Sequence, residues 1–512
     1  MMMRTMKFNI MKKMLIAVLG TVAISSCSLD KDPLGQYSDV TEGVNEEGKK
    51  VVFKDKAAVD NYMQGLYNIL RDRQEHWYLD QMLIAESHSD NAYAGTTGAE
   101  VVPYENNGIE GSNSVVQRDW VRYLEDVAKL NILIVNVDSV ADNSLSSALR
   151  KQYKAEAKIQ RALIFFDMVR LWGDIPLVTK VGKDITAENI EEVYDDYFPS
   201  QTPEKEVYEF LAKDLEEALV DAPSNNAANK TKFSKSVAKA LLAKIYAEKP
   251  IRNYAKVIQY VDDLAADGFA LDADYKNLFA VQEGNAEPLI RNSKESILET
   301  QFFAGNGNWV TWMFGRDLSN YNSNFTWAKW ITPSRDLINA FTREGDEIRY
   351  TESIVYYQAG WSNYYPASNY PFMYKTRSAF SNIIKIRYAD LLLLKAEALI
   401  NGDSPNLTAA AAIIDQVRQR VKLPKLSNAV KGSKDAMLNA LLSERRLELA
   451  FEGQRWYDLV RLNKVESVMN AVYAKDSGRK AQVYPFTENS YRLPIPQSII
   501  DENPKIKQNL GY

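Results

Sequence analysis

Apolar residues recur three and four positions apart over long stretches of this chain, and this spacing constrains the fold more than any other feature. The clearest stretches are 207–219, 236–248, 388–400 and 436–453. Small residues such as Ala240, Ala243 and Ala247 recur within them, where two helices can approach closely. The sequence therefore predicts a mainly α-helical protein built from packed helix pairs.

Glycine and proline residues in the sequence mark the ends of several predicted helices. The segment 160–172 is followed by Gly173 and Pro176, and 407–421 is bounded by Pro405 and Pro424. Such units of helix, turn and helix are similar to tetratricopeptide repeats, although no strict 34-residue period is present. Residues 270–385 lose the helical rhythm, which predicts long loops inserted into the helical frame, where binding sites are often found.

The N-terminus is typical of a secreted lipoprotein. Basic residues up to Lys13 precede an apolar run of about 11 residues, too short for the roughly 20 that a membrane-spanning helix needs. Ile-Ser-Ser-Cys, ending at Cys27, resembles a bacterial lipobox, so we expect a signal peptide over 1–26 and lipid on Cys27. Residues 27–50 are expected to form a lipidated flexible tether, and 51–512 a single domain.

Charge and composition exclude some functions. Four of the 62 basic residues and none of the 67 acidic ones lie in the first 26 positions, so the remainder carries a net charge of −9. Binding nucleic acid needs a basic surface, so we expect none. With one cysteine, Cys27, and two histidines, His76 and His88, no thiolate cluster or histidine-rich metal site is expected.

Aromatic residues are concentrated in the predicted loop region. From 309 to 374 there are 17 aromatics in 66 residues, against 11% in the whole chain, and short polar side chains lie between them. Sugars present flat C–H faces and hydroxyls, which suit exposed rings and neighbouring amides. The alternative is that the rings only pack the loops onto the frame. The candidate ligand-binding residues in this region are Trp309, Trp312, Tyr321, Asn322, Trp327 and Trp361.

Several motifs together resemble one family, the SusD/RagB outer-membrane lipoproteins. They are the lipobox, the 120–131 helix, FFDMVRLWGDIPLVT (165–179), IRYAD (386–390), VRQRVKLP (417–424), ERRLELAFEGQRWYDLVR (444–461) and the terminus 493–512. The resemblance implies a SusD-like fold, with tetratricopeptide-like helix pairs supporting a loop-rich region. It also implies a cell-surface glycan-binding lipoprotein in the outer membrane of a Gram-negative cell, which delivers its ligand to a SusC-like TonB-dependent transporter.

The same resemblance nominates a second loop. In family members a loop after an S-D-N segment commonly contributes an aromatic and polar contacts to the glycan site, and here it reads Ser89-Asp90-Asn91-Ala92-Tyr93. Asp90, Asn91 and Tyr93 are therefore expected to contact the ligand.

Two other functions remain open from sequence. Some relatives capture peptides. A secreted glycoside hydrolase would also need aromatic subsites and a pair of carboxylates. Glu444, Glu448 and Glu452 lie four apart on one helical face, but the arginines around them favour ion pairing. The resemblance implies a binding protein without a catalytic step, and we expect no cofactor. The segment 272–277 is too short a match to a calcium-binding loop, so the sequence does not support bound calcium.

Overall fold

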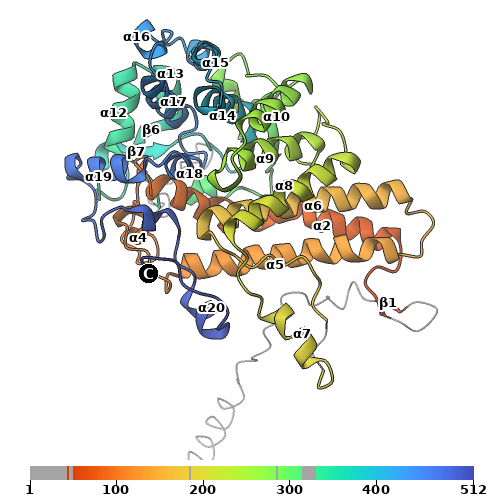
Figure 1. Ribbon diagram of the computed structural model, residues 1–512. Coiled ribbons are helices and arrows are strands. Elements are labelled where there is room, and N and C mark those ends of the chain that lie inside the picture. Colours follow the sequence, from red (N-terminus) through yellow and green to blue (C-terminus); the bar gives the residue numbers. More distant parts are fainter. Residues whose placement is uncertain (1–42, 45–49, 184–185, 284–285, 314–329) are drawn as a thin grey trace, which may run out of the picture.

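A computed structural model describes residues 43–44, 50–183, 186–283, 286–313 and 330–512 (Figure 1). The expected signal peptide and Cys27 lie outside these residues. Within the described ranges, no helix combines the length and the apolar character needed to cross a membrane.

The chain is mainly helical, as predicted. The helices are α2 (Lys56–Asp72), α3 (Asp80–Met82), α4 (Val102–Asn106), α5 (Ser114–Asn136), α6 (Ser147–Trp172), α7 (Ile190–Tyr197), α8 (Glu204–Asp221), α9 (Lys235–Ala247), α10 (Tyr254–Ala266), α11 (Val310–Met313), α12 (Arg335–Glu344), α13 (Glu347–Ser353), α14 (Tyr388–Asn401), α15 (Leu407–Arg420), α16 (Asn428–Lys431), α17 (Lys434–Glu448), α18 (Arg455–Arg461), α19 (Val465–Lys475) and α20 (Gln497–Glu502). Two π-helical turns, Glu75–Leu79 and Leu83–Ser87, flank α3.

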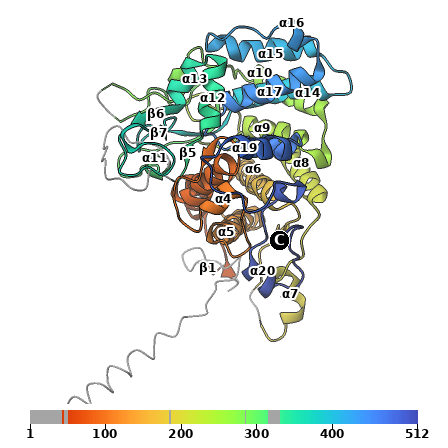
Figure 2. The same ribbon diagram turned by 90° about the vertical axis from the view of Figure 1, so that its left-hand side faces the viewer.

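Helices close in sequence pack against one another and form the frame. Helix α5 packs on α6, α6 on α8, α8 on α9, α9 on α10, and α10 on α14, which in turn contacts α15 and α17 (Figures 1 and 2). Ala240, Ala243 and Ala247 of α9 are all buried, so their small side chains allow these close approaches. The predicted helix pairs are thus confirmed.

Local sequence explains where these helices begin and end. Helix α6 begins after Ser146, whose hydroxyl accepts a hydrogen bond from the backbone N–H of Leu149 at 3.2 Å. It ends at Gly173, whose φ of +75° disfavours any residue with a side chain. The prediction for 160–172 therefore gave the correct end, but the helix begins thirteen residues earlier.

The region 270–385 is mostly irregular, as expected, but it also contains short strands and the helices α11 to α13. The strands of the described chain are β1 (Gly43–Val44), β2 (Lys50–Val51), β3 (Ala92–Tyr93), β4 (Ser296–Thr300), β5 (Thr332–Pro333), β6 (Ile354–Tyr357), β7 (Tyr370–Met373) and β8 (Ile383–Arg387). They pair antiparallel as β1–β2, β3–β5, β4–β8 and β6–β7. The β4–β8 ladder joins the start of the irregular region to its end, directly before α14.

One large hydrophobic core contains residues from Phe53 to Ile506. Trp120 of α5 and Trp172 of α6 pack edge to face within it, with their ring centroids 5.2 Å apart. Both tryptophans are buried, so they belong to the core.

A buried cluster of arginines and glutamates joins the irregular region to the C-terminal helices. We call it the arginine–glutamate cluster, and its members are Arg349, Arg387, Arg420, Glu295, Glu444, Glu448 and Glu452. Arg387, at the end of β8, donates to Glu295 at 2.7 Å and to Glu448 at 2.6 Å. Arg349 of α13 donates to Glu444 at 2.6 Å and to Glu448 at 3.0 Å.

Burial opposes ionisation of Glu448, but Arg420, Arg387 and Arg349 outweigh it and hold the pKa of this carboxyl well below its usual range. Burial raises the pKa of Glu444. Both side chains are enclosed and bound by guanidinium groups. The helical row Glu444, Glu448 and Glu452 is therefore part of an ion-pair network, and the ion-pairing interpretation from sequence is confirmed.

The cluster predicts that removing a buried charge lowers the stability of the fold much more than removing an exposed charge. Replacing Glu448→Gln leaves three buried guanidinium groups short of a carboxylate, so we expect the free energy of unfolding to fall by about 3–5 kcal/mol. Asp262→Asn is the control, because Asp262 pairs with Lys395 at the surface, where such a pair contributes about 0–1 kcal/mol. Urea unfolding of both variants measures the contrast, and equal losses would contradict a special role for the cluster.

His88 is buried beside the loop that holds Asp90. Its Nδ1–H donates to the carbonyl oxygen of Tyr104 at 2.7 Å, and its ring centroid lies 4.0 Å from that of Trp456. Burial lowers the pKa of His88 to about 4. This histidine is therefore neutral in the folded protein near pH 7, and it satisfies a backbone carbonyl within the core.

This lowered pKa predicts how stability depends on pH. An unfolded histidine takes up a proton near pH 6.5, whereas folded His88 does so only near pH 4, so its stabilising contribution is complete above pH 6.5 and is lost as pH falls. Between pH 7 and pH 4.5 the stability advantage of wild type over His88→Gln should shrink by about 2–3 kcal/mol. Urea unfolding at both pH values measures it. An advantage that does not change with pH would refute the assignment.

Candidate functional site

Three aromatic side chains stand out at the surface after strand β4. Phe303, Trp309 and Trp312 are 47%, 39% and 42% exposed, and all three lie within ten residues of the sequence. We call them the aromatic surface. Trp309 and Trp312 are three residues apart at α11 and share its outer face, whereas Val310, Thr311 and Met313 are buried. Two of the predicted ligand-binding residues are therefore accessible to a ligand.

The backbone beneath these rings is fixed by two buried amides. Asn308 donates from Nδ2 to the carbonyl of Ser378 at 2.9 Å and accepts from the N–H of Thr311 at 3.0 Å. Gln74 donates to the carbonyl of Gly307 at 3.1 Å and accepts from the N–H of Trp309 at 2.8 Å. The backbone that bears the rings is thus fixed by hydrogen bonds, which reduces the conformational entropy lost when a ligand binds.

Helix α2 ends next to the aromatic surface. The guanidinium of Arg71, in its last turn, lies 5.8 Å from the ring centroid of Phe303. A cation, two indoles and a phenyl ring therefore lie at one surface region. Such a region offers both C–H stacking and hydrogen-bond donors to a polar ligand.

Three predicted site residues, Tyr321, Asn322 and Trp327, lie outside the described residues. The chain on either side of them converges, because the N–H of Trp330 donates to the carbonyl of Met313 at 3.1 Å. Those three positions therefore remain candidates from sequence alone.

The prediction for Asp90 and Asn91 is corrected by the structure. Asp90 is 1% exposed, and both of its carboxylate oxygens accept hydrogen bonds from Arg455 at 2.8 Å. Burial opposes its ionisation, but Arg446 and Arg455 outweigh burial and lower its pKa. Asn91 is also buried and donates to Glu86 at 2.7 Å. Both side chains hold the loop against α17 and α18, which leaves them no face for a ligand.

Tyr93 is corrected for the same reason. It is fully buried, its hydroxyl donates to Asp476 at 2.6 Å, and its ring stacks on Tyr364 with centroids 4.4 Å apart. Burial raises its pKa to about 12. Tyr93 therefore joins β3 to the loop that contains Tyr364 and is part of the packing.

Trp361 is half-buried in a small separate core. Its ring meets Tyr370 and Phe372 edge to face, at 5.7 Å and 6.1 Å between centroids. This tryptophan mainly packs its loop onto β7, which is the alternative that the sequence left open for the aromatic cluster.

The sequence pattern did not reveal two parts of this site. Phe303 precedes the dense aromatic segment, which begins at Trp309, so the aromatic pattern did not include it. Gln74 is more than 230 residues away in sequence from Gly307 and Trp309, which it binds. No local pattern predicts a contact of that separation.

Two parts of the chain match models of known protein families. Residues 245–512 match the SusD family, and residues 36–247 match the family described as starch-binding, associating with outer membrane. Among curated proteins, it is similar to SusD-like protein P38 of Formosa agariphila, with 25% identity over 80% of this chain and 82% of that one.

Solved structures have the same fold. A laminarin-binding SusD-like protein aligns with a TM-score of 0.66 and 23% identity over 90% of this chain and all of that one. Surface glycan-binding protein A from Bacteroides fluxus aligns with a TM-score of 0.71 and 20% identity over 89% of this chain and 99% of that one. Since the SusD match covers more than half of its residues, this chain belongs to the SusD family.

Proposed function

We propose that this protein captures a glycan at the surface of a Gram-negative cell and delivers it to a SusC-like TonB-dependent transporter. The observation that carries the proposal is the aromatic surface, in which Phe303, Trp309 and Trp312 expose their rings on a fixed backbone. Stacking of sugar C–H faces on two or three rings gives modest affinity, with a Kd in the micromolar to millimolar range.

The family relationship supports the same function. One structural relative binds laminarin and another is named as a surface glycan-binding protein. Glu444 and Glu448 are buried and ion-paired, so they do not form the accessible carboxylate pair that a glycoside hydrolase would need. Binding without catalysis is therefore the function that we propose.

We further propose that lipid on Cys27 holds the protein at the outer membrane. The lipobox-like segment before Cys27 and the family description of outer-membrane association support this anchor. Several acyl chains on one cysteine give stable anchoring, which a single chain does not. The polar residues 28–50 then separate the domain from the membrane.

The anchor has a direct test in cells. Cys27→Ala should abolish incorporation of labelled palmitate and move the protein from the outer-membrane fraction to the soluble fraction, because no other cysteine is present. Ser26→Ala keeps a small residue before the cysteine and should retain both properties. Continued labelling of the Cys27→Ala protein would exclude this lipidation site.

The aromatic surface is tested with the chain from Ser28 onward in affinity gels that contain laminarin, starch, xylan or mannan. Wild type should be retarded by one of these glycans, and Trp309→Ala or Trp312→Ala should weaken retardation about tenfold each, because each loses a stacking ring worth about 1 kcal/mol or more. Circular dichroism should show an unchanged fold, since both rings are exposed.

Tyr484→Ala is the matched control, because Tyr484 is an exposed aromatic, 56% accessible, on the segment between α19 and α20. It should bind like wild type. Wild-type binding by both tryptophan variants would remove the aromatic surface from the proposal. Binding only to a peptide pool, or release of shorter sugars from the glycan, would instead favour peptide capture or hydrolysis.

A further inference from the structure

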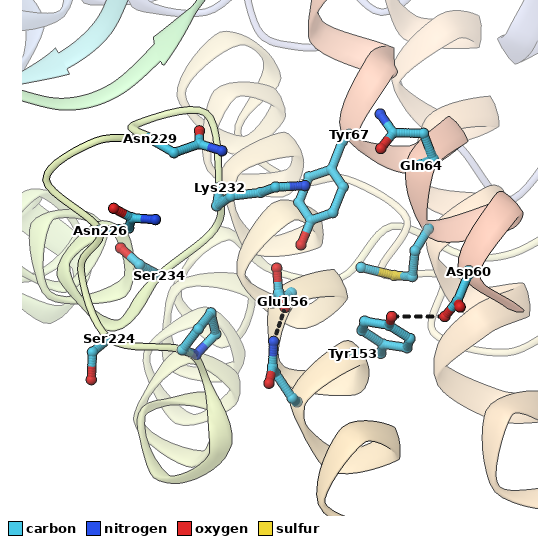
Figure 3. A pocket seen from close by; sticks show the side chains of 13 residues that line it. Asp60, Gln64, Tyr67, Tyr153, Glu156, Ser224, Asn226, Asn229, Lys232 and Ser234 are labelled. Carbon is cyan, nitrogen blue, oxygen red and sulfur yellow. Dashed lines mark hydrogen bonds between the residues drawn. The ribbon is translucent and has the colours of Figure 1, made fainter. Parts of the chain in front are cut away.

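A pocket lies beside the middle of α2, at Asp60, Gln64 and Tyr67. It has a volume of about 510 Å³ and is lined by α2, α6 and the segment that links α8 to α9 (Figure 3). This volume is typical of pockets that bind small molecules. The lining is rich in amides, hydroxyls and charged groups, which narrows the chemistry of its ligand.

The buried wall of the pocket contains polar groups with spare hydrogen-bonding capacity. Glu156 of α6 is 3% exposed, and its carboxylate accepts from Gln152 at 2.9 Å but forms no salt bridge within the described part of the chain. Burial raises its pKa to about 7. Ser234, 6% exposed, is the N-cap residue of α9, yet its hydroxyl makes no cap hydrogen bond. Figure 3 shows Glu156 in the middle of the lining residues.

A cation lies across the pocket from this carboxyl group. The ammonium of Lys232 is 3.3 Å from the ring centroid of Tyr67, and burial lowers its pKa. Lys232 forms no salt bridge among the described residues, although it is close enough to act on the pKa of Glu156. The pocket therefore offers an acceptor and a charged donor that do not neutralise each other directly.

The rim of the pocket adds amide donors. The side-chain oxygens of Asn226 and Asn229 accept from the N–H groups of Ala228 at 2.9 Å and Thr231 at 3.0 Å. Their NH2 groups remain available as donors. Tyr153 contributes a ring whose hydroxyl donates to Asp60 at 2.8 Å. A ligand with many groups that both donate and accept, and with apolar C–H patches, matches this lining.

We infer that the pocket binds one or two hexose units of a neutral saccharide. Hydroxyls satisfy Glu156 and Lys232 together, since each hydroxyl both donates and accepts. The lining carries both signs of charge, with Asp60 and Glu156 on one hand and Lys232 on the other, so neither an anion nor a cation is matched by all of it.

The position of the pocket relates it to the aromatic surface. Asp60, Gln64 and Tyr67 line the pocket, and Arg71 continues the same row of α2 four residues later. Gln74 follows the end of the helix. Arg71 lies over Phe303 and Gln74 binds the backbone at Trp309. Successive residues of the row in α2 are about 6 Å or less apart along the helix axis. The row on α2 therefore leads from the pocket to Arg71 and Phe303, and the inference rests on the proposed function only in that one glycan would supply both sugars.

The experiment is titration of the chain from Ser28 onward with maltose, cellobiose, laminaribiose and mannobiose, measured by calorimetry and saturation-transfer NMR. We expect at least one disaccharide to bind. Ser224→Trp places an indole at the mouth of the pocket from an exposed position, and Glu156→Gln removes the buried acceptor charge. Each should weaken binding at least tenfold.

Two controls separate this site from the aromatic surface. Ala227→Trp adds the same indole at an exposed position of the same segment that does not line the pocket, and it should bind like wild type. The double variant Trp309→Ala, Trp312→Ala should keep disaccharide binding but lose polysaccharide. Thermal melting identifies any variant that fails to fold.

Absence of binding by every disaccharide, or wild-type binding by Ser224→Trp, would overturn the pocket. Loss of disaccharide binding in the double tryptophan variant alone would assign the sugar to the aromatic surface instead. Disaccharide binding without retention of any polysaccharide would retain the pocket and refute the proposed function, so the two can fail separately.

Discussion

Charges buried in a protein interior must be paired, and in this molecule the pairing is what holds an irregular region of more than a hundred residues onto a helical frame. Arg387 ends strand β8 and binds Glu295, which directly precedes β4, and it also binds Glu448 of α17. The β4–β8 ladder starts at this point, with Ser296 opposite Arg387. Strand β4 leads into Phe303 and α11, so the aromatic surface depends on a fixed strand that the arginine–glutamate cluster secures.

The same C-terminal helices secure the other loop that the sequence nominated. Arg446 of α17 donates to Asn91 at 2.9 Å, and Arg455 of α18 binds both oxygens of Asp90. Glu86 accepts from Asn91 and from the backbone of Gly453, and burial raises its pKa to about 7. The motif at 444–461 therefore binds both the irregular region and the loop that contains Asp90 and Asn91. Its arginines form buried ion pairs that hold these segments together. Because Glu444 and Glu448 are enclosed in such pairs, this motif presents no exposed pair of carboxylates.

Helix α2 connects the two surfaces that we assign to saccharides. One row of its residues lines the polar pocket and reaches Arg71, whose guanidinium lies over Phe303. Gln74, just after the end of α2, binds the backbone at Trp309. The two sites differ in chemistry, since one presents exposed rings and the other presents enclosed hydrogen-bonding groups. An extended glycan needs both kinds of contact, with rings for sugar faces along the chain and polar groups for the hydroxyls of a terminal or branching unit.

The sequence by itself determined the helical frame, because helix formation depends on local spacing, caps and breakers such as Ser146 and Gly173. It also indicated the family, and it placed Trp309 and Trp312 among several candidate ligand-binding residues. Only the tertiary structure decided which polar and aromatic residues face solvent. Asp90, Asn91 and Tyr93 have the composition of a binding loop, yet Arg455, Glu86 and Asp476, distant in sequence except for Glu86, occupy their polar groups. Burial depends on contacts between distant segments, as with Gln74 and Trp309, and a local pattern contains no information about such contacts.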